Sequence, residues 1–140
     1  MISQTVEYAL RAVVSLAQNP GKPLTTVEIA KLTKVPEHYL SKVLHTLAKG
    51  KIVRSQRGLH GGYVLDHPVD ELPLLSIINV VDPIQQIEKC PLKLETHGTN
   101  LCALHKKINH SIHLMEEVFR NSTIQTILDE PSQSIPLCDS

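Results

Sequence analysis

Two cysteines and two histidines form the group of residues best suited to chemistry. Cys90, His97, Cys102 and His105 fall within sixteen positions. Cys102 and His105 are three residues apart at the start of a predicted helix, so their side chains should project together. Thiolates and imidazoles are ligands for iron, zinc and iron–sulfur clusters, but the C-x-x-C and H-x₃-H spacings of common zinc sites are absent. The residues alone therefore leave open a metal site or a cysteine-bearing loop of no special chemistry.

A second group of residues consists of hydrogen-bond donors on a predicted helix. Helical spacing places short polar side chains on one face of the segment that follows Pro36, and apolar side chains on the other. The polar face carries His38, Ser41, Lys42 and His45. Side chains of this length reach base edges when a helix lies in the major groove of DNA, and none of them is acidic. This face therefore predicts a DNA-reading helix.

A basic, glycine-rich segment follows that helix. Residues 34–60 contain six basic residues and one acid, a local net charge of +5 in a chain of net charge zero. Such a patch is also compatible with an ordinary solvated surface, but its overlap with the predicted reading helix and a hairpin favours phosphate contact. We expect the following residues to contact DNA: Thr25, Thr26, His38, Ser41, Lys42, His45, Arg54, Arg57 and His60.

The elements that would position these residues form a winged helix-turn-helix. Thr25 and Glu28 have capping-box spacing, which predicts a helix over 26–32. A turn at 33–35 leads to a helix that begins at Pro36, buries one face, and ends with Gly50 as its C-cap. That apolar face consists of Tyr39, Leu40, Val43, Leu44 and Leu47. Strands at 52–55 and 63–65, joined by a segment with three glycines, predict a β-hairpin wing.

The remaining segments predict mainly helices. Ser3 should cap a helix up to Gln18 that packs under the helix-turn-helix, and residues 74–81 should form a short apolar helix. Residues 84–100 are too polar and too broken for a regular element. A helix over 101–120 should follow, and Ser122 should cap a last one ending near Leu128. The long helix has an apolar seam formed by Leu101, Leu104, Ile108, Met115 and Val118, with Ile112 and Phe119 beside it.

The chain is therefore expected to be mainly α with a small β-hairpin. A winged helix-turn-helix DNA-binding domain should span residues 1–82. A cysteine loop and a dimerisation helix should occupy residues 83–130, and a flexible tail that contains Cys138 should occupy residues 131–140. The apolar seam exceeds what one small domain needs, so we expect a homodimer that binds a two-fold symmetric double-stranded DNA operator.

Composition excludes several classes of protein. No apolar run approaches the roughly 20 residues needed to span a bilayer, and the N-terminus lacks signal-peptide order, so we expect a cytoplasmic protein without membrane partners. Three cysteines are an odd number for a disulfide framework. Neither paired carboxylates, a nucleophile–base pair nor a phosphate loop accompanies the possible ligands, which argues against an enzyme.

Several of these motifs resemble the winged-helix transcriptional regulators of the IscR/NsrR, or Rrf-type, family. The resemblance covers most of the chain, from the first helix through the wing to the cysteine loop and the long helix. Its motifs are Glu7-Tyr8-Ala9-Leu10-Arg11, Ile29-Ala30, Tyr39-Leu40 and Arg57-Gly58-x-x-Gly61-Gly62-Tyr63. Membership implies a homodimer with crossed long helices. In the cluster-binding members it also implies an iron–sulfur cluster near the partner's first helix.

The resemblance also suggests a set of cluster ligands. Cys90 and Cys102 match the outer two of the three cysteines that many sensors of this type carry, whereas the middle position falls near Thr96 and His97. His105 matches a histidine ligand of some members, and Glu7 an acidic ligand from the opposite subunit. The implied metal and cluster ligands are therefore Cys90, Cys102, His105, His97 and Glu7, with [2Fe–2S] favoured over [4Fe–4S].

These observations favour a transcriptional regulator, usually a repressor, that senses redox state, nitric oxide or iron–sulfur status through a cluster held by the Cys90–His105 region. The alternative is a stress-responsive regulator without a cluster, which would use its thiols, another metal or haem. A small metalloenzyme is the least favoured class, for the reasons given above.

Overall fold

The computed structural model describes residues 2–95 and 100–137, which fold into a winged helix-turn-helix with a projecting helical arm. Helix α1 (Gln4–Ala17) begins at Ser3, whose hydroxyl accepts a hydrogen bond from the Val6 N–H at 3.3 Å. Helix α2 (Thr26–Thr33) has the full capping box expected at its start. Helix α3 (Glu37–Lys49) follows Pro36, which is its N-cap. These three helices confirm the predicted helix-turn-helix.

The wing is a two-stranded antiparallel sheet. Strand β1 (Val53–Gln56) pairs with β2 (Gly62–Leu65), from Val53 opposite Leu65 to Gln56 opposite Gly62. The backbone of Leu24, just before α2, forms a further bridge with Tyr63. Gly62 permits this approach, since a Cβ atom there would lie 2.5 Å from the Leu24 carbonyl oxygen and its φ is +150°. The wing is thereby attached to the start of α2.

Three helices complete the fold. A 3₁₀ turn, η1 (Val69–Glu71), leads to α4 (Leu74–Val81), then the described part of the long loop leads to α5 (Ala103–Arg120) and α6 (Ile124–Asp129). The bounds predicted for α4 are confirmed. The predicted cap of α6 is wrong: Thr123 accepts from the Thr126 N–H, whereas the Ser122 hydroxyl donates to the Val118 carbonyl. Among residues 2–95 and 100–137, no helix is long and apolar enough to cross a membrane.

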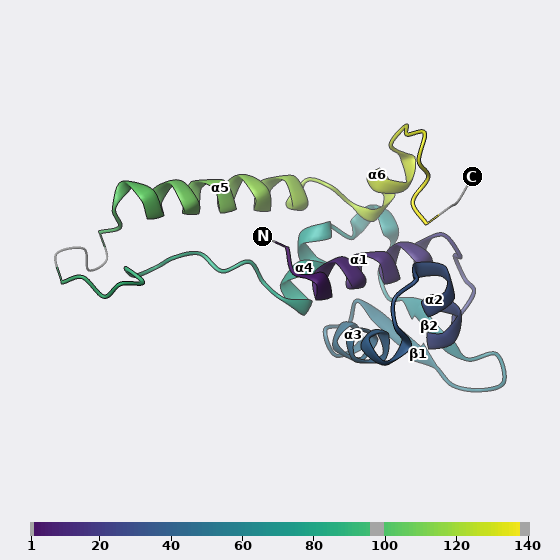
Figure 1. The fold of residues 1–140 in the computed structure, drawn as a ribbon. Helices are drawn as coiled ribbons and strands as arrows, with labels where there is room; N and C mark the ends of the chain where they lie inside the picture. The colour runs from purple at the N-terminus through teal and green to yellow at the C-terminus, as the bar shows by residue number, and fades with distance from the viewer. Residues whose placement is uncertain (1, 96–99, 138–140) are drawn as a thin grey trace.

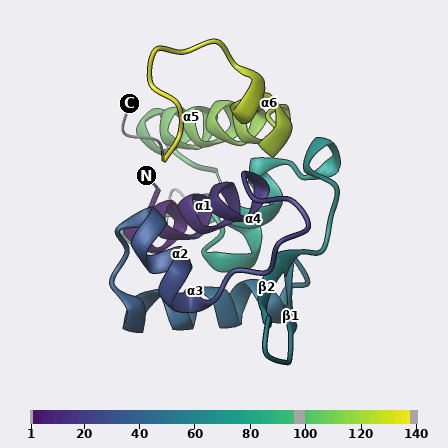
Figure 2. The ribbon, with the colours of Figure 1, turned by 90° about the vertical axis from the view of Figure 1, so that its right-hand side faces the viewer.

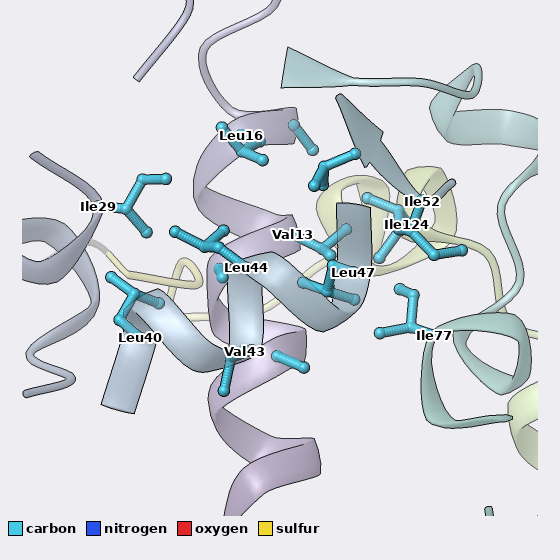
Figure 3. Packing of buried hydrophobic residues seen from close by; sticks show 14 of the residues in the cluster. Val13, Leu16, Ile29, Leu40, Val43, Leu44, Leu47, Ile52, Ile77 and Ile124 are labelled. Atoms are coloured by element: carbon cyan, nitrogen blue, oxygen red, sulfur yellow. The ribbon is translucent and has the colours of Figure 1, made fainter. Parts of the chain in front are cut away.

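The core lies where α1, α3 and α4 meet. Leu40, Leu44 and Leu47 of α3 are completely buried and point toward α1, as Figure 3 shows. Ile77 of α4 and Ile124 of α6 are also completely buried, so the last helix packs onto the winged domain. Burial of aliphatic side chains of this size contributes about 1.5–3 kcal/mol each. An almost wholly aliphatic core therefore stabilises the helix-turn-helix, in keeping with an aromatic content of only 3%.

The buried face of α3 differs from the prediction at its first turn. Tyr39 was expected in the core but is 52% exposed. Its ring lies edge-on to Tyr8 of α1, with 6.4 Å between ring centroids, and 4.6 Å from the His38 ring. Its neighbour Leu40 is completely buried, so Tyr39 lies at the edge of the aliphatic core, where Tyr8 covers part of its ring.

Helix α5 is an arm that reaches away from the winged domain. Figure 1 shows its N-terminal end and the chain that follows α4 extending together to one side, and Figure 2 shows α5 on the opposite side of α1 and α4 from α3. None of the residues of α5 is fully buried, although Phe119 packs against the core and Ile112 is half-buried. Apart from its contacts near Ile112 and Phe119, the apolar seam of α5 is therefore left uncovered by the described residues of the single chain.

Candidate nucleic-acid interface and cysteine loop

The polar face of α3 is fully available to a ligand. His38, Ser41, Lys42 and His45 are all exposed, and the buried leucines of α3 fix the opposite face against α1. Arg11 supports the turn that precedes α3, because its Nη1 donates to the Thr33 carbonyl at 3.0 Å. A helix that reads base edges needs exposed hydrogen-bond donors held in fixed positions, and α3 has both features.

A groove of about 460 Å³ separates the start of α2 from the wing. Thr25, Thr26 and Arg57 line it together, so the structure brings three predicted DNA contacts to one place. Exposed Arg57 supplies a cation, and the threonines lie at the positive end of the α2 dipole. The Thr25 hydroxyl accepts a hydrogen bond from the Glu28 N–H at 3.2 Å, which leaves its own O–H to donate, so Thr25, Thr26 and Arg57 all offer donors to a phosphate.

Arg54 is separated from that groove. It lines a different cavity of about 360 Å³, with Lys22 and His67, and its Nε lies 3.4 Å from the Asp66 carboxylate. Successive residues of a strand point to opposite faces, so Arg54 and the groove residue Ser55 diverge. Arg54 is therefore the predicted contact whose position fits the DNA surface least well.

The wing tip carries a residue that the sequence reasoning did not select. Leu59 is 96% exposed, next to the predicted contact His60, which is exposed as well. Apolar side chains at such tips can insert between base steps in a minor groove. The sequence places this leucine between Gly58 and His60 in a predicted turn, where an apolar side chain is unusual. A search for DNA contacts based on charge overlooks it.

The start of α5 brings together two of the predicted cluster ligands. The Cys102 Sγ lies 3.4 Å from the His105 Nδ1, as their spacing on a helix predicted. Cys90 is buried, with 6% of its surface exposed, in the loop that precedes α5. His97 lies outside the described residues, as does Cys138. A thiolate and an imidazole in contact have the donor chemistry of one edge of an iron–sulfur or metal site.

Glu7 is distant in sequence from the cysteine loop and has a partner of its own. Its carboxylate accepts a hydrogen bond from the Arg11 Nε at 2.7 Å, and both side chains are partly exposed. Among the described residues, no group of three or more His, Cys, Asp or Glu side chains is arranged to hold a metal ion. A complete ligand set therefore needs a ligand from outside residues 2–95 and 100–137, a rearrangement of the loop, or a second chain.

Comparison with known proteins decides the family. The signature of the Rrf2 family, described as iron-dependent transcriptional regulators, matches residues 2–130. The chain belongs to the Rrf2 family. An HTH-type transcriptional regulator of Aquifex aeolicus is 32% identical over 132 residues, which cover 92% of each chain. Rrf2 membership confirms the winged-helix fold and a DNA-binding transcriptional regulator rather than an enzyme.

Two solved structures share the Rrf2 fold of this chain. CymR of Bacillus subtilis, described as its global cysteine regulator, superposes with a TM-score of 0.77 at 25% identity, covering 94% of this chain and 98% of CymR. IscR of T. potens superposes with a TM-score of 0.71 at 26% identity, covering 96% and 93%. The family description names iron whereas CymR is described as a cysteine regulator, so membership alone does not assign this chain's signal.

Proposed function

We propose that this Rrf2-family regulator binds a two-fold symmetric DNA operator as a homodimer and senses iron–sulfur status, redox state or nitric oxide through a cluster bound by the Cys90–His105 region. The observation that carries the sensing proposal is the 3.4 Å contact between the Cys102 Sγ and the His105 Nδ1 at the exposed end of α5. The iron-dependence in the family description supports iron as the metal.

The DNA-binding part of the proposal assigns two kinds of contact. The exposed donors of α3 would read base edges, whereas Thr26 and Arg57 would hold a phosphate beside the wing. Because phosphate contacts set affinity and base contacts set sequence preference, the two groups should be separable by assay. His38, Ser41 and Lys42 should each change preference at particular base pairs by about 1–3 kcal/mol.

The dimer follows from the exposed seam of α5. Leu104, Ile108 and Val118 are 64%, 39% and 62% exposed, and they recur at helical spacing along one face of the arm. A second copy of the same helix offers a matching apolar seam and would bury both. Dimerisation would also bring a second chain to the cysteine loop, where the described residues of one chain include no group of three side chains arranged to hold a metal ion.

The proposed ligands have chemical consequences that can be stated from the residues. Cys90, Cys102 and His105 would hold the cluster, with His97 or the partner subunit's Glu7 completing the set. A bound cluster would supply a redox-active and nitric-oxide-reactive centre, and nitrogen or oxygen ligation would raise its potential and make it labile. Glu7 could serve as a ligand through its second carboxylate oxygen while the first accepts from Arg11, whose other hydrogen bond supports the turn before α3.

A second candidate function is a thiol-based regulator without a cluster. The lack of a three-residue metal-binding group among the described residues favours it, and half-buried Cys102 is more accessible to an oxidant than buried Cys90. In this function Cys90 and Cys102 would change oxidation state or bind a ligand, and DNA affinity would follow.

Absorbance of protein purified without oxygen distinguishes the two functions. A brown protein with iron and acid-labile sulfide in comparable amounts supports the cluster, whereas a colourless protein lacking both excludes it. Cys90→Ala and Cys102→Ala should each remove the chromophore and the dependence of DNA binding on nitric oxide, and far-UV circular dichroism should confirm that both variants fold. Cys138→Ala is the matched control and should change neither. Loss of the chromophore in that control alone would refute the assignment of the loop.

A further inference from the structure

Asn109 of α5 forms two hydrogen bonds to one residue of the cysteine loop. Its Oδ1 accepts from the Ile87 N–H at 2.8 Å, and its Nδ2 donates to the Ile87 carbonyl at 2.7 Å. A carboxamide presents a donor and an acceptor with the spacing of a peptide group, so it pairs with Ile87 as a neighbouring strand would. Asparagine is a poor helix former, and this contact gives it a role in the middle of α5.

The contact of Asn109 with Ile87 lies on the same side of α5 as the contact of Cys102 with His105. His105 and Asn109 are four residues apart and Cys102 and His105 three apart, so the three side chains follow one face of the helix. Cys90 is three positions after Ile87 in the chain, so the two residues lie at most about 10 Å apart. Attachment at Asn109 therefore limits how far Cys90 can move from this face.

A turn restrains Cys90 on its other side. The Lys93 N–H donates to the Cys90 carbonyl at 3.0 Å, and Pro91 occupies the second position of this turn, which its fixed φ favours. Cys90 is buried whereas Pro91 to Glu95 are exposed. The loop thus holds Cys90 inward between an attachment to α5 and a tight turn.

We infer that Asn109 is a positioning residue that holds Cys90 on the Cys102–His105 side of α5 before any ligand binds. The two hydrogen bonds join residues 22 positions apart, so part of the entropic cost of bringing Cys90 to this face is met without the ligand. A preorganised loop binds its ligand more tightly than one that must first be ordered. What the loop binds rests on the proposed function, whereas the placement of Cys90 does not.

Asn109→Leu tests this inference, because leucine has a similar size and can form neither hydrogen bond. The full-length, reduced, metal-free protein is treated with N-ethylmaleimide, and mass spectrometry follows each cysteine separately. Freed from its local restraint, Cys90 should react about tenfold faster or more, with Cys102 within about twofold of the wild-type rate. Ser111→Ala is the matched control, because it removes only a hydrogen bond within α5, to the Lys107 carbonyl. Its Cys90 rate should equal that of the wild type.

Asn109→Asp gives a graded variant and a second readout. The aspartate retains an acceptor for the Ile87 N–H but places a carboxylate oxygen against the Ile87 carbonyl. Amide hydrogen exchange of Ile87 should therefore be fastest in Asn109→Leu, intermediate in Asn109→Asp and slowest in the wild type. The thermal midpoint of the winged domain should not change, since neither Ile87 nor Asn109 belongs to its core. That comparison separates a local role from general destabilisation.

The outcomes for the inference and for the proposed cluster are distinguishable. If Asn109→Leu changes neither the Cys90 reaction rate nor Ile87 exchange, Asn109 does not position the loop, whatever the wild type binds. If both change while the wild type contains neither iron nor sulfide, the positioning role stands and the cluster proposal fails. If the wild type contains a cluster, Asn109→Leu should also lose its iron faster to a chelator, which supports both.

Discussion

Arg54 and Arg57 are three residues apart but lie on different sides of the wing. Arg57 is in the loop beside Thr26, whereas Arg54 lies beside Lys22 and close to Asp66. Sequence reasoning selected both from their charge and their place in the hairpin. Their positions differ because Arg54 lies within β1, where side chains alternate between the two faces of the hairpin, whereas Arg57 lies in the loop after β1 ends at Gln56.

This difference predicts unequal effects of two matched substitutions. Arg57→Ala should weaken binding to all duplexes and reduce the slope of log affinity against log salt by about one unit, since one phosphate contact is lost. Arg54→Ala removes the same charge on the other face and should leave the slope nearly unchanged. Fluorescence anisotropy over a range of salt concentrations measures both. Equal slope changes in the two variants would place Arg54 in the DNA interface.

Substitution of Leu59 should change the affinity for DNA without changing its salt dependence, unlike substitution of Arg57. Because it is uncharged and 96% exposed at the wing tip, Leu59→Ala should weaken binding to a duplex selected by the wild-type protein without changing the salt slope. Its stability in thermal unfolding should equal that of the wild type, since the side chain has little to pack against. An unchanged affinity for the selected duplex would exclude the tip from the interface.

Side-chain roles were predictable where local spacing determines them and not where distant elements meet. The contact of Cys102 with His105 follows from three-residue spacing on a helix. The Asn109 attachment spans 22 positions, and Tyr39 is half exposed where its ring meets Tyr8 of α1, 31 positions away. Neither leaves a periodic signal in the sequence.

At the scale of elements, Gly50 has a second role besides the expected C-cap. It is the C-cap of α3 with φ −79°, an ordinary value, and the left-handed position falls on Lys51 at φ 61°. A Cβ atom on Gly50 would lie 2.3 Å from a methyl group of Val80 in α4. Gly50 therefore permits the close packing of α3 on α4. Capping rules anticipated the glycine, but only the helix–helix contact explains it.

Gly50→Ala should therefore destabilise the domain through this contact. Overpacking of this kind costs typically about 1–3 kcal/mol. Val80→Ala removes the clashing methyl groups, so the double variant should recover much of the loss caused by Gly50→Ala. Urea unfolding of the single and double variants forms a double-mutant cycle that measures this coupling. If the two effects simply add, the α3–α4 contact is not the reason for the glycine.

The predicted element bounds agree with the structure to within about two residues, because caps and helical spacing are local signals. Alternating and helical periodicity correctly assigned the hairpin, α1 and α4. The packing of α6 onto the winged domain was not predicted, since its backbone bonds to Leu72 and Leu74 join segments about fifty residues apart. The tail also returns to α1, where the Gln18 side chain donates to the Pro136 carbonyl at 2.6 Å.

At the scale of the whole molecule, the proposed DNA-reading and sensing surfaces lie on opposite sides. Helix α3 and the wing are on one side of α1 and α4, and α5 is on the other (Figure 2). A signal at the start of α5 must therefore act through packed helices or through a change in the dimer. Glu7, Arg11 and the Thr33 carbonyl form one line of direct contacts along α1 to the turn before α3.

The exposed seam of α5 predicts that a charged side chain placed there disrupts the dimer. Ile108→Glu should yield monomers with weak operator binding, because an unpaired charge in an apolar interface costs several kcal/mol, and a single domain loses the effective concentration of its partner. Lys106→Glu is the control: it makes a larger charge change on the opposite face of α5, and should remain dimeric. Sedimentation measures the assembly, and circular dichroism checks that each winged domain still folds. Intact dimers of Ile108→Glu with unchanged affinity would place the interface on another surface, and the cysteine loop would then have to find its remaining ligand within its own chain.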